Sequence, residues 1–404
     1  MNKLIPTILL FFFISGTFTT ALTPVSASSE LIENSWNTKT PMNHERTNFR
    51  VVTVDNKIYA IGGSYQTEVP SYDQWPLFVT NYLGTNERYD PLTDTWITLT
   101  SMPSPRAGFA IATVQGKIYC IGGVTGKSGM YSNLGINEVY DIATDSWSIK
   151  TSPMFNSEYW VQSQVVNEKI FVITGSSEDH KFGDLYMYDP QKDVWTEKAS
   201  IPTNLTTKDY HLISTVIDDK LIVVSVVNPD YPYTGSGQMI VMCYNLQNDA
   251  WSEEKVGPEI KVGSGPRIVG TTTGIYAPKK AYFLGFDRTT ASPLFWIYDP
   301  IKDAWSIGKA VESFEGDVAV VNDLLYVIIS TKTMQYVPIG YRSTTYNTPT
   351  PTPSTSVVPS EPEPTDTSKT AFTHIIVTVL ALTIGVVTTT GMFFYLSIRK
   401  RKNK

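Results

Sequence analysis

The sequence is poor in the residues that build metal centres. Its 404 residues include only two cysteines and four histidines. Three of the histidines, His44, His180 and His211, precede residue 342, and no two of them have the close spacing of a ligand pair. Neither cysteine lies near any of them in the sequence. We therefore expect no metal and no cofactor.

Two cysteines are also too few for a disulfide framework. Cys120 and Cys243 lie in the apolar segments IYCIGG and MIVMCYN, which belong to different repeats. We expect both to be buried as small hydrophobic side chains. The alternative is a single disulfide, which is common in secreted chains.

The sequence lacks a Gly-x-Ser-x-Gly nucleophile elbow and a P-loop, the signatures of two large enzyme classes. It also lacks an excess of positive charge, because the formal net charge is −6. The last six residues alone carry five positive charges, so the rest of the chain has a net charge of −11. Phosphate backbones bind positive surfaces, so nucleic acid is excluded as a partner.

Two long apolar runs lie at the ends of the chain. Residues 1–27 combine Lys3, an apolar stretch and the small residues Val25-Ser26-Ala27, a pattern typical of a secretory signal peptide. An uncleaved membrane anchor is the alternative. Residues 371–398, with an uncharged run from Ile375, predict a transmembrane helix in a lipid bilayer. The basic residues 399–404 then mark the cytoplasmic side, which predicts a single-pass type I protein of the cell membrane.

Proline, threonine and serine dominate residues 342–370, just before the predicted helix. Such a segment cannot bury enough apolar area to offset the entropy of folding, and its prolines favour extended conformations. We expect a semi-rigid stalk there, which leaves residues 28–341 as the extracellular domain.

That domain repeats one phrase, YDPLTDTW at residues 89–96, YDPQKDVW at 188–195 and YDPIKDAW at 298–305. Variants begin at Tyr140 and Tyr244, and the spacings between the five tryptophans are 51, 48, 56 and 54 residues. A second phrase keeps the same period, as in KIYAIGG at 57 and KIYCIGG at 117. Each unit reads as four antiparallel strands, named a to d from the axis outward.

The sixth unit is divided between the two ends of the domain. Tyr336 has no tryptophan after it, and Trp36 has no tyrosine before it. We therefore predict a closed ring in which the N-terminal strand completes the last sheet. Closure of the ring removes exposed strand edges.

These motifs resemble the kelch family of β-propellers. The resemblance is carried by Gly62-Gly63 and Gly122-Gly123, by the Tyr-Asp-Pro turns, and by the Pro-x-Arg elements that end at Arg46 and Arg106. It implies an all-β, six-bladed kelch-type β-propeller followed by one C-terminal transmembrane helix. The repeat residues then have structural roles: Trp36, Trp96, Trp147, Trp195, Trp251, Trp305, Gly62, Gly63, Gly122 and Gly123.

Each repeated residue type has a physical reason to recur. Tryptophan fills the gap between blades, and the paired glycines permit unusual backbone angles or close approach of a neighbour. We expect the aspartate two residues before each tryptophan to bond to nearby backbone N–H groups within its own turn.

Long insertions fall in the b–c loops, which share one end of the propeller with the d–a loops. Their aromatic side chains suit contact with a protein or a glycan, although they can also pack on each other to hold the loops. The candidates for ligand binding are Tyr65, Trp75, Tyr131, Tyr231 and Tyr233.

The d–a loops place Arg46, Arg106, Glu158, Asp209, Arg267 and Ser313 at equivalent positions around the axis. The resemblance implies a scaffold role for the arginines, but Arg106 and Arg267 remain candidates for ligand binding. Glu158 and Asp209 interrupt the repeated arginine, so we include them with their neighbours Trp160 and His211.

Anchor, stalk and aromatic loops, without catalytic residues, predict a cell-surface binding or adhesion protein rather than an enzyme. The alternative is a sugar-acting enzyme, since the resemblance extends to six-bladed mutarotases of the sialic-acid type. In that case Glu158, Asp209, Arg106 and Arg267 would supply the acid, the base and the anion clamp.

Overall fold

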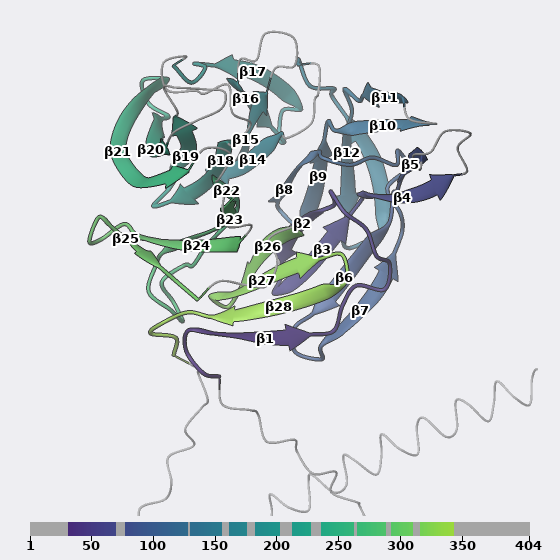
Figure 1. The fold of residues 1–404 in the computed structure, drawn as a ribbon. Helices are drawn as coiled ribbons and strands as arrows, with labels where there is room; N and C mark the ends of the chain where they lie inside the picture. Colours follow the sequence, from purple (N-terminus) through teal and green to yellow (C-terminus); the bar gives the residue numbers. More distant parts are fainter. Residues whose placement is uncertain are drawn as a thin grey trace, which may run out of the picture. The chain divides into compact units, whose positions relative to one another are not determined.

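The computed structural model describes residues 31–69, 77–127, 130–155, 161–175, 182–202, 212–227, 236–261, 265–287, 292–309 and 316–342. These residues form six four-stranded antiparallel sheets (Figure 1). In this part of the chain no helix is long and apolar enough to cross a membrane. The predicted signal peptide, stalk, transmembrane helix and basic tail lie outside the described residues.

The first three blades follow one another along the chain. Blade 1 consists of β2 (Arg50–Val54), β3 (Lys57–Ile61), β6 (Asn86–Asp90) and β7 (Thr95–Leu99). Blade 2 consists of β8 (Ala110–Val114), β9 (Lys117–Ile121), β12 (Asn137–Asp141) and β13 (Ser146–Lys150). Blade 3 consists of β14 (Gln162–Val166), β15 (Lys169–Gly175), β16 (Phe182–Asp189) and β17 (Val194–Lys198).

The next three blades close the ring. Blade 4 consists of β18 (Leu212–Ile217), β19 (Lys220–Val227), β20 (Ser236–Asn245) and β21 (Ala250–Lys261). Blade 5 consists of β22 (Gly265–Thr271), β23 (Ala281–Asp287), β24 (Ser292–Asp299) and β25 (Ala304–Ile307). Blade 6 consists of β26 (Gly316–Val321), β27 (Leu324–Ile329), β28 (Lys332–Val337) and β1 (Ser35–Lys39). The inner strands contact one another in the cyclic order β2, β8, β14, β18, β22, β26 and back to β2.

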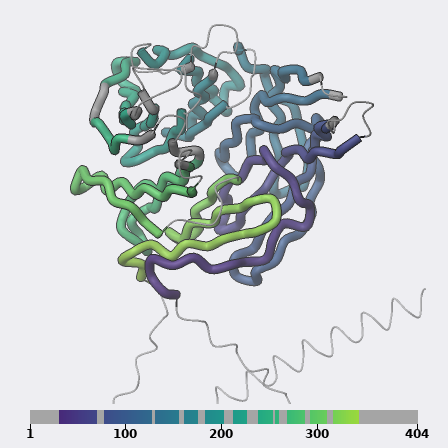
Figure 2. Tube along the Cα trace, viewed as in Figure 1, coloured from purple at the N-terminus to yellow at the C-terminus, as the bar shows by residue number. Residues whose placement is uncertain are grey.

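The predicted closure by the N-terminal strand is confirmed. Strand β1 pairs antiparallel with β28, and Trp36 lies opposite Tyr336. Other blades show the same pairing within one continuous stretch of chain, for example Tyr89 opposite Trp96. Both ends of the described chain therefore leave the propeller from blade 6 (Figure 2). They leave at the end opposite the b–c loops, because β28 ends and β1 begins where strands c and d are joined in the other blades.

Two-residue turns join strands a and b in five of the six blades. Their residues have positive φ, as expected for hairpin turns that match the twist of the strands. They are Asp55-Asn56, Gln115-Gly116, Asn167-Glu168, Asp218-Asp219 and Asn322-Asp323. In blade 5 a longer connection runs from Thr271 to Ala281 instead.

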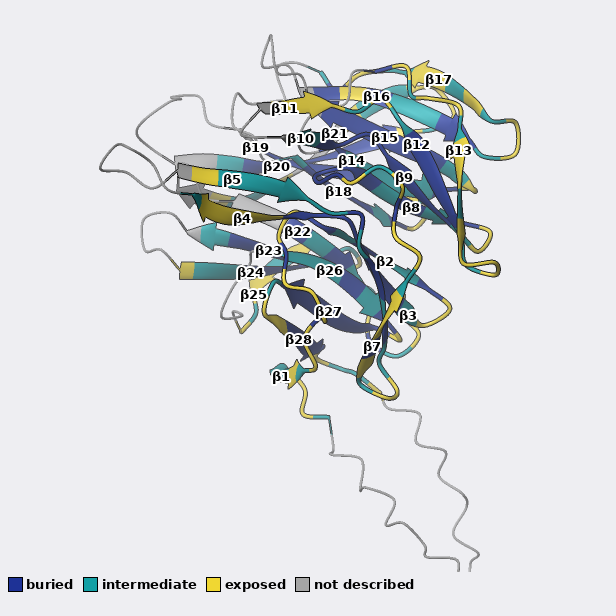
Figure 3. Cartoon of the chain, turned by 90° about the vertical axis from the view of Figure 1, so that its right-hand side faces the viewer, coloured by how far each residue is buried: buried dark blue, intermediate teal, exposed yellow. Residues whose placement is uncertain are grey.

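The hydrophobic core lies between the blades, where the face of one sheet packs on the next. One cluster joins Phe49 and Tyr89 of blade 1 to Tyr326 and Val337 of blade 6. The second strands, such as β3, β9 and β27, are the most buried, and the outer strands are the most exposed (Figure 3). Cys120 and Cys243 are both buried, which confirms the prediction of buried hydrophobic side chains.

Candidate functional site

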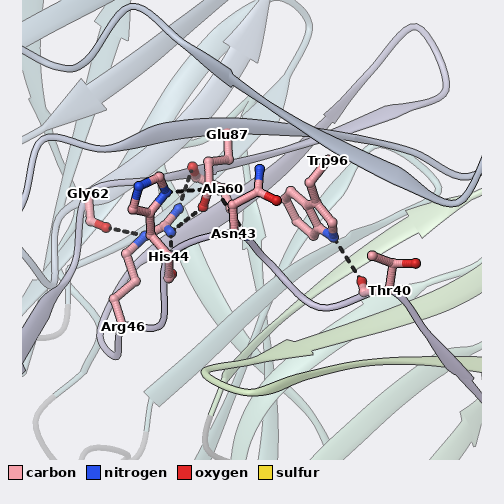
Figure 4. A network of polar contacts seen from close by, with 8 residues as sticks. All are labelled: Thr40, Asn43, His44, Arg46, Ala60, Gly62, Glu87 and Trp96. Carbon is pink, nitrogen blue, oxygen red and sulfur yellow. Dashed lines mark hydrogen bonds and ion pairs between the residues drawn. The ribbon is translucent and has the colours of Figure 1, made fainter.

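A buried ion pair fixes the d–a loop of blade 1 (Figure 4). The Arg46 guanidinium is 1% exposed and pairs with the carboxylate of Glu87. It also donates hydrogen bonds to the carbonyl oxygens of Gly62 (2.9 Å), Ala60 (3.0 Å) and His44 (2.8 Å). The other carboxylate oxygen of Glu87 accepts the Asn43 N–H at 3.1 Å and lies 3.0 Å from Nδ1 of His44. All charges and most polar atoms of this network therefore have partners.

Blade 2 repeats this arrangement. Arg106 is fully buried, pairs with Glu138, and donates to the carbonyl oxygens of Cys120 (2.8 Å) and Ser104 (3.0 Å). The Ser104 hydroxyl also bonds to Glu138, at 2.9 Å. The structure therefore places Arg106 inside the scaffold, away from any surface that a ligand reaches.

The paired glycines form the junction between blades 1 and 2. A Cβ atom at Gly62 would lie 2.5 Å from the Phe109 ring and 2.7 Å from the Arg106 carbonyl oxygen. The Gly63 N–H donates to that same carbonyl oxygen at 2.9 Å, and both glycines have positive φ. Only glycine meets both demands at once.

A set of tyrosine, aspartate and tryptophan that we call the staple recurs in blades 1 to 5, and Asn34 replaces the aspartate in blade 6. In blades 1 to 4 its aspartate bonds to the preceding blade. In all six blades the Tyr and Trp ring centroids lie 4.9–5.2 Å apart. In blade 1 the Trp96 Nε1–H donates to the Thr40 carbonyl oxygen at 2.9 Å, at the end of the outer strand of blade 6. Tryptophans 36, 147, 195 and 251 make the same bond to their preceding blades.

The aspartate of this staple differs from the prediction. Asp94 lies in the turn at φ 53°, but its Oδ1 accepts the Tyr89 hydroxyl at 2.6 Å and the Thr40 N–H of the preceding blade at 2.9 Å. The local turn bond is made by Asp90 instead, which accepts the Leu92 N–H. The predicted partner was therefore wrong, and the motif joins blades as well as turning the chain.

The hydrogen bonds of the staple also shift pKa values. Partial burial opposes ionisation of Asp94, but the bonds from Tyr89 and Thr40 outweigh it and hold the pKa of Asp94 below its ordinary value. In blade 2 the bond from Tyr140 is the main cause that lowers the pKa of Asp145. These carboxylates are therefore ionised in the folded protein at neutral pH.

The insertions of blades 1 and 2 form two projecting β-ribbons rather than irregular loops. The first pairs β4 (Ser64–Val69) with β5 (Leu77–Tyr82), and the second pairs β10 (Val124–Lys127) with β11 (Met130–Asn133). Strands β5 and β10 lie side by side (Figure 3). Bridges from Thr47 to Ser64 and from Ala107 to Val124 join both ribbons to the d–a loops at their base. We call these four strands the crest.

The crest carries three exposed aromatic rings. The exposed fractions are 43% for Tyr65, 49% for Phe78 and 68% for Tyr131. Pairing of Glu68 with Phe78 puts Phe78 on the same ribbon face as Ser64, whereas Tyr65 lies on the opposite face. Because Tyr131 lies on the same face as Val124, and Val124 is the equivalent of Ser64, Phe78 and Tyr131 occupy equivalent faces of neighbouring ribbons.

A second feature is a cavity of about 320 Å³ on the propeller axis. Residues from the inner strands of all six blades line it. Side chains in this lining bond across blade boundaries: Ser163 to the Ile111 carbonyl oxygen (2.6 Å), Gln164 to the Ser214 carbonyl oxygen (2.8 Å), and Thr215 to Thr271 (2.6 Å). The lining also contains Arg50 and Asp317, which were not predicted as site residues.

A signal for these two residues exists in the repeat register. Arg50, Gln162 and Asp317 each pair with the isoleucine at the fifth position of strand b, where blade 2 has the apolar Ala110. The predicted site residues came from the loops, whereas Arg50 and Asp317 lie on the inner strands β2 and β26.

Most other predicted ligand-binding residues cannot be placed. Glu158, Trp160, Asp209, His211, Trp75, Tyr231 and Tyr233 lie outside the described residues. The backbone of Arg267 lies at an irregularity in the pairing of β22 with β23. Within the described residues, no group of three or more His, Cys, Asp or Glu side chains could hold a metal ion.

Comparison with known proteins agrees with this geometry. The Kelch motif model matches residues 45–103 and 105–154, which contain blades 1 and 2. Kelch-like protein 36 of Bos taurus is 26% identical over 284 residues, covering 68% of this chain and 41% of that protein. Kelch-like protein 40 of Mus musculus is 24% identical over 291 residues, covering 72% of this chain and 42% of that protein. The chain thus spans less than half the length of these relatives.

Among solved structures, the one titled "Structure of YjhT" aligns with 73% of this chain and 95% of its own, with a TM-score of 0.50 and 13% sequence identity. At this identity the likeness shows the propeller fold alone.

Proposed function

Because the chain is a kelch-repeat β-propeller protein, we propose that it is a protein-binding scaffold that contacts its partner through the crest of blades 1 and 2. The observation that carries this proposal is the exposure of Phe78 and Tyr131 on equivalent faces of two adjacent ribbons. Large aromatic rings bury much area on binding and lose little conformational entropy, which is why they anchor protein interfaces.

The base of the crest is suited to binding because it is already ordered. The Arg46–Glu87 and Arg106–Glu138 pairs hold the two d–a loops, and these loops pair with the first residues of both ribbons. A partner therefore finds the base of each ribbon in position, which reduces the entropy that binding must overcome.

The direction of the crest fits display on a surface. The crest lies at the b–c end of the propeller, and residues 34 and 337 lie at the opposite end. We propose that residues 1–27 direct secretion, that residues 342–370 form a stalk, and that residues 371–398 anchor the chain in the cell membrane. The chain would then leave the propeller for this stalk at the end opposite the crest.

The test compares a crest variant with a matched surface variant. Phe78→Ser with Tyr131→Ser removes both rings, whereas Ile149→Ser removes an apolar side chain, 72% exposed, from the outer strand β13. Each tagged full-length chain is expressed in its own cells, and bound proteins are identified by quantitative mass spectrometry. We expect at least one protein that the wild type and Ile149→Ser retain and the crest variant loses, and that binds the purified wild type directly.

Identical sets of bound proteins for all three chains would contradict the proposal. A glycan array provides the second arm of the experiment. If a glycan binds and this binding depends on Phe78 and Tyr131, while no protein binds, the partner is a glycan and the crest is still the binding surface.

A further inference from the structure

The axial cavity carries one positive and one negative side chain that do not pair with each other. Arg50, at the start of β2, donates from Nε to the Phe109 carbonyl oxygen (2.9 Å) and from Nη2 to the Val161 carbonyl oxygen (3.2 Å). Its guanidinium therefore reaches toward blades 2 and 3. Among the described residues, no ion pair within 4.0 Å joins Arg50 to Asp317.

Asp317 lies on the opposite side of β2, in blade 6. Its two carboxylate oxygens accept the N–H groups of Val51 and Val318, each at 2.9 Å. Enclosure raises the pKa of Asp317 above its ordinary value, and the charge of Arg50 with the two N–H groups offsets only part of that rise. Asp317 is partly buried in the cavity wall, and no cation of the described residues pairs with it within 4.0 Å.

The lining has further hydrogen-bonding capacity that the protein leaves unused. None of the hydrogen bonds of the described residues uses Nη1 of Arg50 or the side-chain amide of Gln162. Polar groups enclosed in this way usually face water or a ligand, because a missing hydrogen bond is costly.

The shape and chemistry of the cavity narrow the class of ligand. A volume of about 320 Å³ is at the small end of ligand pockets. The described lining contains no aromatic ring, so it offers no surface on which a sugar or a nucleobase could stack. It offers one cation and one anion, held apart on different blades.

We propose that the axial cavity binds a small zwitterion, an amino acid or a compound like it. Its carboxylate group pairs with Arg50, its ammonium group pairs with Asp317, and the Gln162 amide supplies neutral hydrogen bonds. This site is separate from the crest and does not depend on the protein-binding function.

Three isosteric probes test the proposal by isothermal titration calorimetry on the purified full-length chain. L-Valine carries both charges, 2-hydroxy-3-methylbutanoate lacks the ammonium group, and isobutylamine lacks the carboxylate. A fourth probe, 4-aminobutanoate, carries both charges farther apart. We expect at least one zwitterion to bind about tenfold or more tightly than both singly charged probes.

Variants assign the two charges. Asp317→Asn keeps an acceptor for the Val51 N–H, and we expect it to weaken zwitterion binding about tenfold while leaving the hydroxy acid unchanged. Arg50→Lys keeps a positive charge, whereas Arg50→Gln removes it, so binding should fall more in the second variant. Asp219→Asn makes the same chemical change as Asp317→Asn at an exposed turn, and should have no effect.

The proposal is overturned if no zwitterion binds at millimolar concentration to folded wild-type protein. It is also overturned if the hydroxy acid binds as tightly as the zwitterions, or if Asp317→Asn and Asp219→Asn behave alike.

Discussion

Blades 1 and 2 hold their d–a loops with a buried ion pair, whereas at the position of its glutamate blades 3 to 6 have an aromatic residue or a methionine. Glu87 and Glu138 stand two residues before the tyrosine of their repeats, and each pairs with a buried arginine. The equivalent residues in the other blades are Tyr186, Met242, Trp296 and Met334. In blade 3 the Tyr186 ring packs on Phe155 of the d–a loop, with ring centroids 5.0 Å apart.

The difference shows that the ion pair is not required to form a blade. All six sheets have the same strand order and the same Tyr–Trp pair. Blades 1 and 2 differ in a second respect, since they carry the ribbons of the crest. We infer that the buried charges serve mainly to orient the base of the crest, because ion pairs demand more specific geometry than apolar contacts.

The largest effect is expected from breaking one ion pair. Arg106→Leu leaves the Glu138 carboxylate buried without its partner, which should lower the free energy of unfolding by about 3–5 kcal/mol. Denaturant titration of the purified protein measures this loss.

A double variant replaces the ion pair of blade 2 by apolar residues like those of the later blades. Arg106→Leu with Glu138→Met places methionine where blades 4 and 6 have it, and should recover most of the lost stability. Hydrogen exchange should nevertheless become faster at the base of β10, because the guanidinium no longer orients the loop. Unchanged exchange in the double variant would break the proposed link between the charges and the crest.

Removal of an aspartate of the staple should destabilise the protein less than breaking an ion pair. The loss of stability should be the same in blade 1 and blade 3. Asp94→Ala in blade 1 and Asp193→Ala in blade 3 each remove bonds to a tyrosine hydroxyl and to a backbone N–H of the preceding blade. We expect each variant to lose about 1 kcal/mol of stability in denaturant titrations. If only one of the two variants is destabilised, the aspartate does not have the same stabilising role in both blades.

The same carboxylates make stability depend on pH. Their pKa values are lowered in the folded protein, by bonds that outweigh the opposing effect of burial at Asp94 and Asp193. Their contribution is therefore complete above the unfolded value of about 3.9 and is lost as the pH falls below it. We expect the urea concentration at the midpoint of unfolding to decrease when the pH is lowered below about 4. This decrease should be smaller in Asp94→Asn. An equal fall in both proteins would argue against this assignment.

The smallest effect on stability is expected at the crest itself. Tyr131 is 68% exposed, so Tyr131→Ser should change the free energy of unfolding by less than about 0.5 kcal/mol. Partner binding should weaken clearly, because an exposed ring contributes to contact with a partner and not to the folded core. A large loss of stability would mean that the ring packs within the crest instead of binding a partner.

The ring closure could be predicted because its signal was repeated. Six copies of one strand and five complete Tyr–Trp pairs left Trp36 and Tyr336 without partners, and only closure gives each its ring contact. The long-range role of Asp94 could not be predicted, since a residue in a turn gives no sign of a bond to a blade distant in the sequence.

The crest was only partly predictable. Tyr65 and Tyr131 were predicted as binding residues, but the ribbon pairing was not predicted, because SYQTEV shows little of the alternation that marks a half-buried strand. The ribbon projects from the blade and both of its faces are accessible to solvent, so residues 65–68 are all exposed. Arg50 and Asp317 were missed for a different reason, since polar residues at the start of an inner strand acquire meaning only when six strands meet at one axis.

Photo-crosslinking at single positions tests the central claim most directly. A photoreactive phenylalanine is placed at position 78, 131 or 149 of the full-length chain, and the cells that express it are irradiated. We predict that positions 78 and 131 yield the same crosslinked protein and that position 149 does not. Equal yields of that protein from all three positions, or none from positions 78 and 131, would contradict a binding surface at the crest.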